Sequence, residues 1–184
     1  MFLANHAAVG ALLAAQTTNP FSAFILGYVS HYIIDMIPHG DEKVGTWIKK
    51  KNPTSRAAGI LLIDLGVMAL FFSTLSFRVD FPHPYTIALG AFGAMLPDFL
   101  SGFYEYLRKF LNPNKKEHYK ENGGWIIQTA KRLLWDNFFL ERHFLIHRKI
   151  HFALGYYISF VKGMILQAAT LGFLYWSALK FFGT

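Results

Sequence analysis

Two histidines and two aspartates lie close together in one short segment, residues 31–41. Imidazole nitrogens and carboxylate oxygens are ligands with which proteins hold zinc, manganese and iron. Side chains four residues apart project from the same face of a helix, about 6 Å apart at Cβ, so His31 and Asp35 can reach one cation. Pro38 ends or kinks such a helix and leaves His39 on the next turn. The segment therefore predicts a metal site.

The elements before this segment must bring a further ligand to it. Residues 2–16 and 21–37 are apolar and flank a Thr-Thr-Asn-Pro turn, which predicts a helical hairpin. His6 and His31 are about equally far from the bend, so antiparallel pairing of the two helices brings them level. We expect His6 to be part of the same site.

A second hairpin carries two acids within apolar segments. Asp64 and Asp98 lie equally far before and after the turn near Phe81. A carboxylate at the centre of a membrane helix costs about 2.5 to 3.5 kcal/mol, so Asp64 needs a partner, which is either a metal or a buried Lys, Arg or hydroxyl group. Pro97 interrupts the helical hydrogen bonds beside Asp98 and leaves backbone carbonyls that need partners.

Residues 125–150 mix apolar and aromatic residues with basic ones, a pattern typical of an amphipathic helix at a membrane interface. Histidines recur in it at four-residue intervals. We expect His147 and His151 to be ligands, and for His143 two readings stay open, a ligand or an ordinary amphipathic side chain. The adjacent Arg148 and Lys149 could neutralise phosphate charge.

The composition indicates a membrane protein. The chain has 184 residues, of which 53% are hydrophobic and 17% aromatic, with a mean hydropathy of +0.29. Residues 57–77 are long enough to cross a hydrocarbon core of about 30 Å. Further candidate spans are 151–179, 2–16, 21–37 and 85–107. The sequence predicts an all-α polytopic helical bundle of four or five spans with one interfacial helix, forming a single domain over residues 1–184.

The net charge of +7 is concentrated near Lys49–Lys51 and between Arg108 and Lys149. Beside apolar spans, such clusters mark the cytoplasmic side and contact with anionic lipid headgroups, which is a better explanation than nucleic-acid binding. The chain lacks cysteine, so thiolate ligands and cysteine nucleophiles are excluded. The first residues lack the pattern of a cleaved secretory signal, and we expect them to be retained.

Four motifs together resemble the membrane-bound metal-dependent hydrolases of the YdjM type, which are similar in pattern to the zinc-dependent phospholipase C and P1 nuclease group. These motifs are His6-Ala-Ala-Val-Gly10, His31-x-x-x-Asp35-x-x-Pro38-His39-x-Asp41, Gly93-Ala-Met-Leu-Pro97-Asp98 and His147-Arg148-x-x-His151. The resemblance covers most of the chain and supports as ligands His6, His31, Asp35, Asp98, His147 and His151. It implies hydrolysis of a phosphoester in a bacterial or archaeal inner membrane. The chain lacks the His-x-x-x-Glu pattern of the soluble phospholipases, which argues against a full trinuclear zinc site.

The sequence thus predicts a divalent-metal hydrolase, with one or more zinc ions, acting on a membrane lipid or lipid-linked substrate at the cytoplasmic side. In this hypothesis one ion is held by His6, His31, Asp35 and His39. The residues that complete this site or hold a second ion are Asp64, Asp98, His147 and His151. Catalytic roles fall to Asp35, Asp98 and Arg148. Two alternatives remain open: a cation or proton transporter that uses the same buried groups, and a non-enzymatic membrane scaffold.

Overall fold

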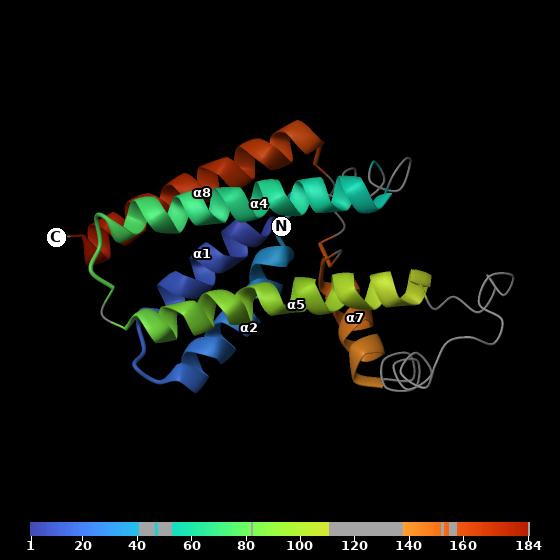
Figure 1. Ribbon diagram of the computed structural model, residues 1–184, viewed down its shortest axis with the longest axis horizontal. Helices are drawn as coiled ribbons and strands as arrows, with labels where there is room; N and C mark the ends of the chain where they lie inside the picture. Colours follow the sequence, from blue (N-terminus) through green and yellow to red (C-terminus); the bar gives the residue numbers. More distant parts are fainter. Residues whose placement is uncertain are drawn as a thin grey trace, which may run out of the picture. The chain divides into compact units, whose positions relative to one another are not determined.

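The structure is a computed structural model that describes residues 1–40, 47, 53–81, 83–110, 138–151, 153–154 and 158–183. This part of the chain forms six α-helices: α1 (Leu3–Ala14), α2 (Pro20–Asp35), α4 (Pro53–Ser76), α5 (Pro84–Phe110), α7 (Phe138–His151) and α8 (Phe160–Phe182) (Figure 1). The predicted all-helical class is confirmed. Some predicted features lie outside the described residues, namely Asp41, Lys49–Lys51, the loop 112–124 and residues 125–137 of the interfacial helix.

The chain divides into two compact units, which are described separately. One unit comprises residues 1–96 and 150–184, and the other comprises residues 97–149. The boundary falls within α5, immediately before Pro97. The single domain over 1–184 stays a prediction.

Three helices of the described chain are long and apolar enough to cross a membrane. Their candidate spans are Ser55–Ser76, Pro84–Glu105 and Phe160–Phe182. Helix α1 has 12 residues and α2 has 16, so at 1.5 Å per residue they are about 18 and 24 Å long, short of a hydrocarbon core of about 30 Å. The total of four or five spans stays a prediction.

Capping residues fix where two of the helices begin. The Asn19 side chain accepts hydrogen bonds from the amides of Phe21 and Ser22, at 2.9 and 3.1 Å, and starts α2. The Ser159 hydroxyl accepts the Lys162 amide at 3.4 Å and starts α8 at Phe160. The prediction that the last span begins at His151 is therefore wrong, because α7 ends there and a new cap begins α8.

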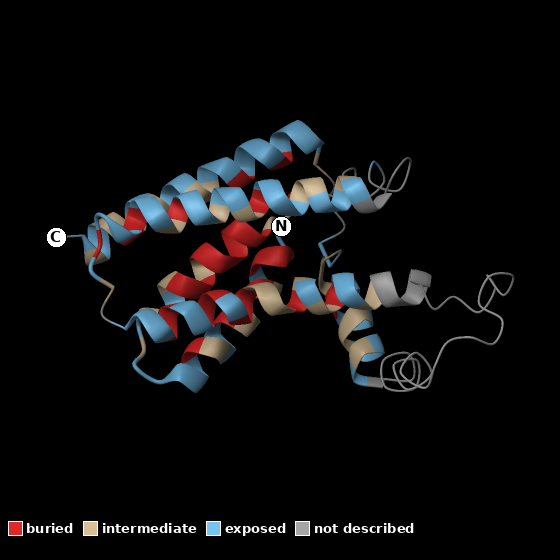
Figure 2. Ribbon diagram, viewed as in Figure 1, coloured by how far each residue is buried: buried red, intermediate tan, exposed pale blue. Residues whose placement is uncertain are grey.

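Helix α1 is the most buried helix of its unit. It packs against α2, α4 and α8 (Figure 1), and Figure 2 shows it largely buried while α4 and α8 are mainly exposed. Small residues make this packing close. The exposed positions of α4 and α8 include large apolar side chains such as Leu62, Ile63, Val161 and Ile165. Such faces are typical of helices that contact lipid.

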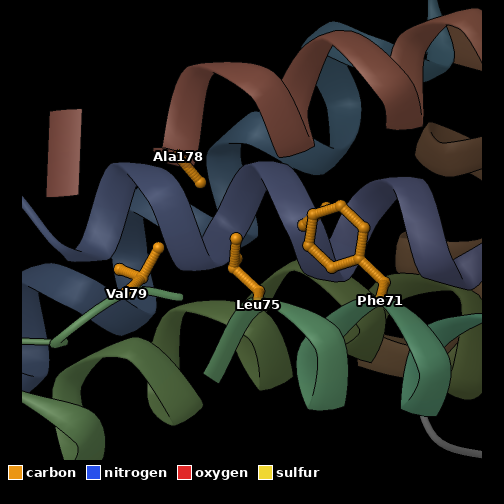
Figure 3. Packing of buried hydrophobic residues seen from close by; sticks show 5 residues of the cluster. Phe71, Leu75, Val79 and Ala178 are labelled. Carbon is orange, nitrogen blue, oxygen red and sulfur yellow. The ribbon is translucent and has the colours of Figure 1, made fainter. Parts of the chain in front are cut away.

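A small apolar cluster joins α4 to α8 next to α1. Figure 3 shows Phe71 and Leu75 of α4, Val79 just after it, and Ala178 of α8, and Ala8 of α1 completes the group. Leu75 is 1% exposed and Ala8 is fully buried. This cluster fixes α1 between the two long helices.

Glycines bring backbones together where α2 meets the first half of α5. A Cβ atom at Gly27 would overlap the carbonyl oxygen of Gly90, and one at Gly93 would overlap that of Phe24. Gly10 of α1 likewise meets Gly90. The α1–α2 hairpin is therefore held firmly against the first half of α5, with its histidines turned into the unit.

Candidate metal centre

One carboxylate lies at the centre of the histidine cluster. Asp35, at the end of α2, is 1% exposed, and His6 and His31 are fully buried beside it. His6 Nε2 lies 3.1 Å from Asp35 Oδ1, and His31 Nε2 lies 3.2 Å from Asp35 Oδ2. The two imidazole rings stack with their centroids 4.1 Å apart. The predicted pairing of His6 with His31 across the hairpin is confirmed.

The hydrogen bond at His31 Nδ1 determines the tautomer of the ring, and so whether Nε2 faces Asp35 with a proton or with a lone pair. His31 Nδ1 lies 2.8 Å from the carbonyl oxygen of Ala94. A carbonyl can only accept, so Nδ1 carries the proton, and in the neutral ring Nε2 presents its lone pair to the carboxylate. Ala94 lies three residues before Pro97 on α5, so His31 is anchored to the backbone of that helix. The predicted exposure of carbonyls by Pro97 stays a prediction, because the carbonyl that loses its helical donor is that of Gly93.

His39 is held in the same way, although it lies beyond the end of α2. Its Nδ1 donates to the carbonyl oxygen of Ile37 at 2.6 Å, which leaves Nε2 to face the cluster. That nitrogen lies 4.0 Å from Asp35 Oδ1 and 3.1 Å from His151 Nε2. Metal-binding histidines commonly donate their other ring nitrogen to a carbonyl, because this fixes the tautomer and the direction of the lone pair.

The spacing of the donor atoms suits a cation. One ligand atom from each of Asp35, His39 and His151 lies within 4.8 Å of the others, a group that could hold a metal ion. Metal–nitrogen bonds of about 2.0 to 2.1 Å place neighbouring ligand atoms roughly 3 Å apart, which matches the distances around Asp35. Two lone-pair donors at such distances repel each other unless a proton or a metal lies between them.

A positive group already lies at this position. The amino group of Met1 donates to Asp35 Oδ1 at 2.8 Å and also contacts His39 Nε2. These contacts place one positive charge against the carboxylate of Asp35 and the ring of His39.

Burial also sets the charge of His6, which lies outside the three long apolar helices. Desolvation lowers the pKa of His6 to about 4, although its hydrogen bond to Asp35 opposes this shift. The ring is therefore neutral at pH 7. Only the neutral imidazole can act as a metal ligand.

Asp64 belongs to α4, and its side chain lies next to the N-terminal end of α1. Its two carboxylate oxygens accept the backbone amides of Leu3 at 2.6 Å and Ala4 at 3.0 Å. These amides belong to the first turn of α1, where a helix has no acceptors of its own and favours a negative charge. The buried acid of the predicted span thus has partners of a kind that sequence reasoning did not consider.

The unit 97–149 contains its own carboxylate–imidazole pair. His147 Nε2 lies 3.5 Å from Asp98 Oδ1, and His147 Nδ1 lies 2.8 Å from the Ser101 hydroxyl. His143 Nε2 lies 3.1 Å from the Pro97 carbonyl and 3.4 Å from Ser101 Oγ. His143 therefore takes part in this network rather than only covering a helix face. Arg148 and Lys149 are exposed on α7, as is Glu141.

Sequence reasoning missed two polar residues that support these groups. Ser101 follows Asp98 by three residues on α5, so the helical period places both on one face. Gln167 was visible as one of only two strongly polar interruptions in the last apolar segment, and it is 3% exposed in α8. A buried amide in an apolar helix is a signal for a structural or functional partner.

The chain matches no protein-family model, no curated protein and no solved structure. A functional assignment therefore rests on the geometry of the His–Asp cluster and on the chemistry of its side chains.

Proposed function

We propose that this chain is an integral membrane, metal-dependent hydrolase that cleaves a phosphoester of a lipid or lipid-linked substrate. The observation that carries the proposal is the arrangement around Asp35. A buried carboxylate faces imidazole nitrogens at 3.1 and 3.2 Å, and the ring of His31 is anchored from behind by a carbonyl.

Zinc is the ion that we assign to this centre. A donor set of imidazole and carboxylate without sulfur is typical of catalytic zinc and also suits manganese or iron. The proposed ligands are Asp35, His6, His31, His39 and His151. Asp98 and His147 are proposed as ligands within their own unit. A catalytic ion supplies Lewis acidity and a water whose pKa is lowered toward 7.

The proposed substrate class rests on the exposed residues of each unit, taken separately. The exposed apolar faces of α4 and α8 favour a protein embedded in lipid, so the most abundant phosphoesters near it are those of lipids. Arg148 and Lys149 provide exposed positive charge on α7, which suits an anionic phosphate or lipid headgroup. We assign Arg148 to charge neutralisation during hydrolysis. The basic segments favour a cytoplasmic location of the site in an inner membrane.

Metal analysis together with a hydrolysis assay tests the proposal. Protein purified in detergent is analysed for bound metal and then assayed with bis(p-nitrophenyl) phosphate and with mixed phospholipid vesicles. Asp35→Asn keeps the volume of the side chain but removes the charge. Its metal affinity and hydrolysis should fall by more than about 100-fold, beyond the effect of losing an outer-shell partner. The control Asp80→Asn changes an exposed acid and should leave both unchanged.

Two results would overturn the proposal. One is a wild type that binds no metal, together with an Asp35→Asn variant that hydrolyses phosphoesters as fast as the wild type does. The other is metal-dependent ion flux in proteoliposomes without hydrolysis of any lipid, which would favour the transporter.

A further inference from the structure

Gln167 of α8 contacts both segments that deliver ligands to the cluster. Its Nε2 donates to the carbonyl oxygen of His39 at 3.1 Å, and its Oε1 accepts the backbone amide of Phe2 at 2.7 Å. Oε1 also lies 3.4 Å from Asn5 Nδ2. One buried amide thus links the turn after α2 to the start of α1.

The rest of this face of α8 is shaped for the same turn. Gly163, one helical turn before Gln167, leaves no room for a Cβ atom, because that atom would overlap the carbonyl oxygen of His39. Gly40 adopts a φ of 75°, a conformation that glycine takes without strain, and it packs against the backbone of Ser159 and Gly163. The backbone of His39 is therefore seated directly on α8.

Ordinary packing does not call for an amide at this place. Burying an unpaired amide in an apolar environment is strongly unfavourable, so Gln167 is tolerated because its donor and its acceptor are both used. Methionine would fill the same volume without that requirement. Unlike methionine, the amide forms directional hydrogen bonds, which fix the position of the His39 carbonyl relative to the start of α1.

We propose that Gln167 is a positioning residue of the metal centre, holding His39 and the first turn of α1, which carries His6, in register around Asp35. This inference rests on the proposed metal site and identifies what sets its geometry. Asp64 accepts the amides of Leu3 and Ala4 at the start of α1, and Gln167 hydrogen-bonds both to this start and to the His39 carbonyl.

Cobalt(II) substitution tests this role, because the visible d–d spectrum reports ligand geometry independently of activity. Purified full-length protein is titrated with Co²⁺ and with Zn²⁺. Gln167→Met should weaken Zn²⁺ affinity by about 10- to 100-fold and change the cobalt spectrum, as expected for outer-shell partners. The control Gln16→Met replaces an exposed glutamine of the described chain and should match the wild type.

A second substitution perturbs the His39 carbonyl without changing Gln167. Gly163→Ala places a methyl group against the His39 carbonyl and should alter the cobalt spectrum as well, whereas Gly172→Ala, which meets no neighbour within 4 Å, should not. Wild-type spectra in folded Gln167→Met and Gly163→Ala would overturn the positioning role. Loss of monodisperse protein in both variants would overturn it too, since the role would then be in folding. A wild type that binds neither metal would instead overturn the proposed function itself.

Discussion

The imidazole ring of His6 stacks on that of His31, with centroids 4.1 Å apart and an angle of 28° between the planes. The two rings come from different helices, and each presents Nε2 to a different oxygen of Asp35. The carboxylate is thus approached from α1 and from α2 at once, and loss of either ring removes an imidazole within 3.2 Å of one of its oxygens.

His6→Asn should therefore weaken Zn²⁺ binding by at least about 100-fold, because it removes one proposed ligand and exposes the stacked face of His31. Isothermal titration of the detergent-solubilised protein measures the affinity. His83→Asn alters an exposed histidine in the turn before α5 and is the matched control. Equal affinity in the two variants would remove His6 from the ligand set.

The glycine contact between α2 and α5 predicts a stability effect. Gly27→Ala should lower the free energy of unfolding by about 1 to 3 kcal/mol, because the new methyl group meets the rigid Gly90 backbone. In open space the same change in a helix is favourable by roughly 0.5 to 1 kcal/mol, as expected for Gly172→Ala. Thermal unfolding in detergent compares the two, and a Gly27→Ala variant as stable as Gly172→Ala would contradict the packing.

The absence of cysteine makes the membrane topology directly testable. Ser55 and Asp80 are exposed residues near opposite ends of α4. If the basic segments lie in the cytoplasm, an impermeant maleimide should label Asp80→Cys on intact spheroplasts and Ser55→Cys only after permeabilisation. The reverse pattern would place the proposed site on the outer side.

The hydroxyl of Ser101 should influence His147. Ser101→Ala removes the hydrogen-bond partner of His147 Nδ1 and frees the ring to rotate away from Asp98. If this pair holds a metal, the variant should lose about 10- to 100-fold in metal affinity or hydrolysis. Ser73→Ala, at an exposed position of α4, serves as the control. Unchanged binding and hydrolysis in Ser101→Ala would mean that the network only packs α7 against α5.

The sequence predicted the contacts that depend on local periodicity. His31 and Asp35 share a helix face because they are four residues apart, and His6 meets His31 because both are equally far from one turn. The central residues of α4 and α5 were also predictable as helical, because a long apolar run in a membrane can form few structures other than a helix.

The remaining geometry depends on contacts distant in sequence. The direction of His39 after Pro38 is set by Gln167 and Gly163 of α8, and no local pattern contains that information. The partners of Asp64 are backbone amides, which occur at nearly every position and therefore leave no signal in the sequence. The late start of α8 depends on the Ser159 cap, a signal weaker than the apolar run in which it lies.

The dependence of the first helix on the last one has a consequence for synthesis. The ribosome makes α1 before α7 and α8, so Gln167, which holds the start of α1, and His151, which faces His39, are translated after it. The nascent hairpin therefore carries its histidines and Asp35 through membrane insertion without the groups that align them. The proposed centre can therefore assemble only after α8 has been made, and a chain that ends before residue 167 should lack the amide that holds the start of α1.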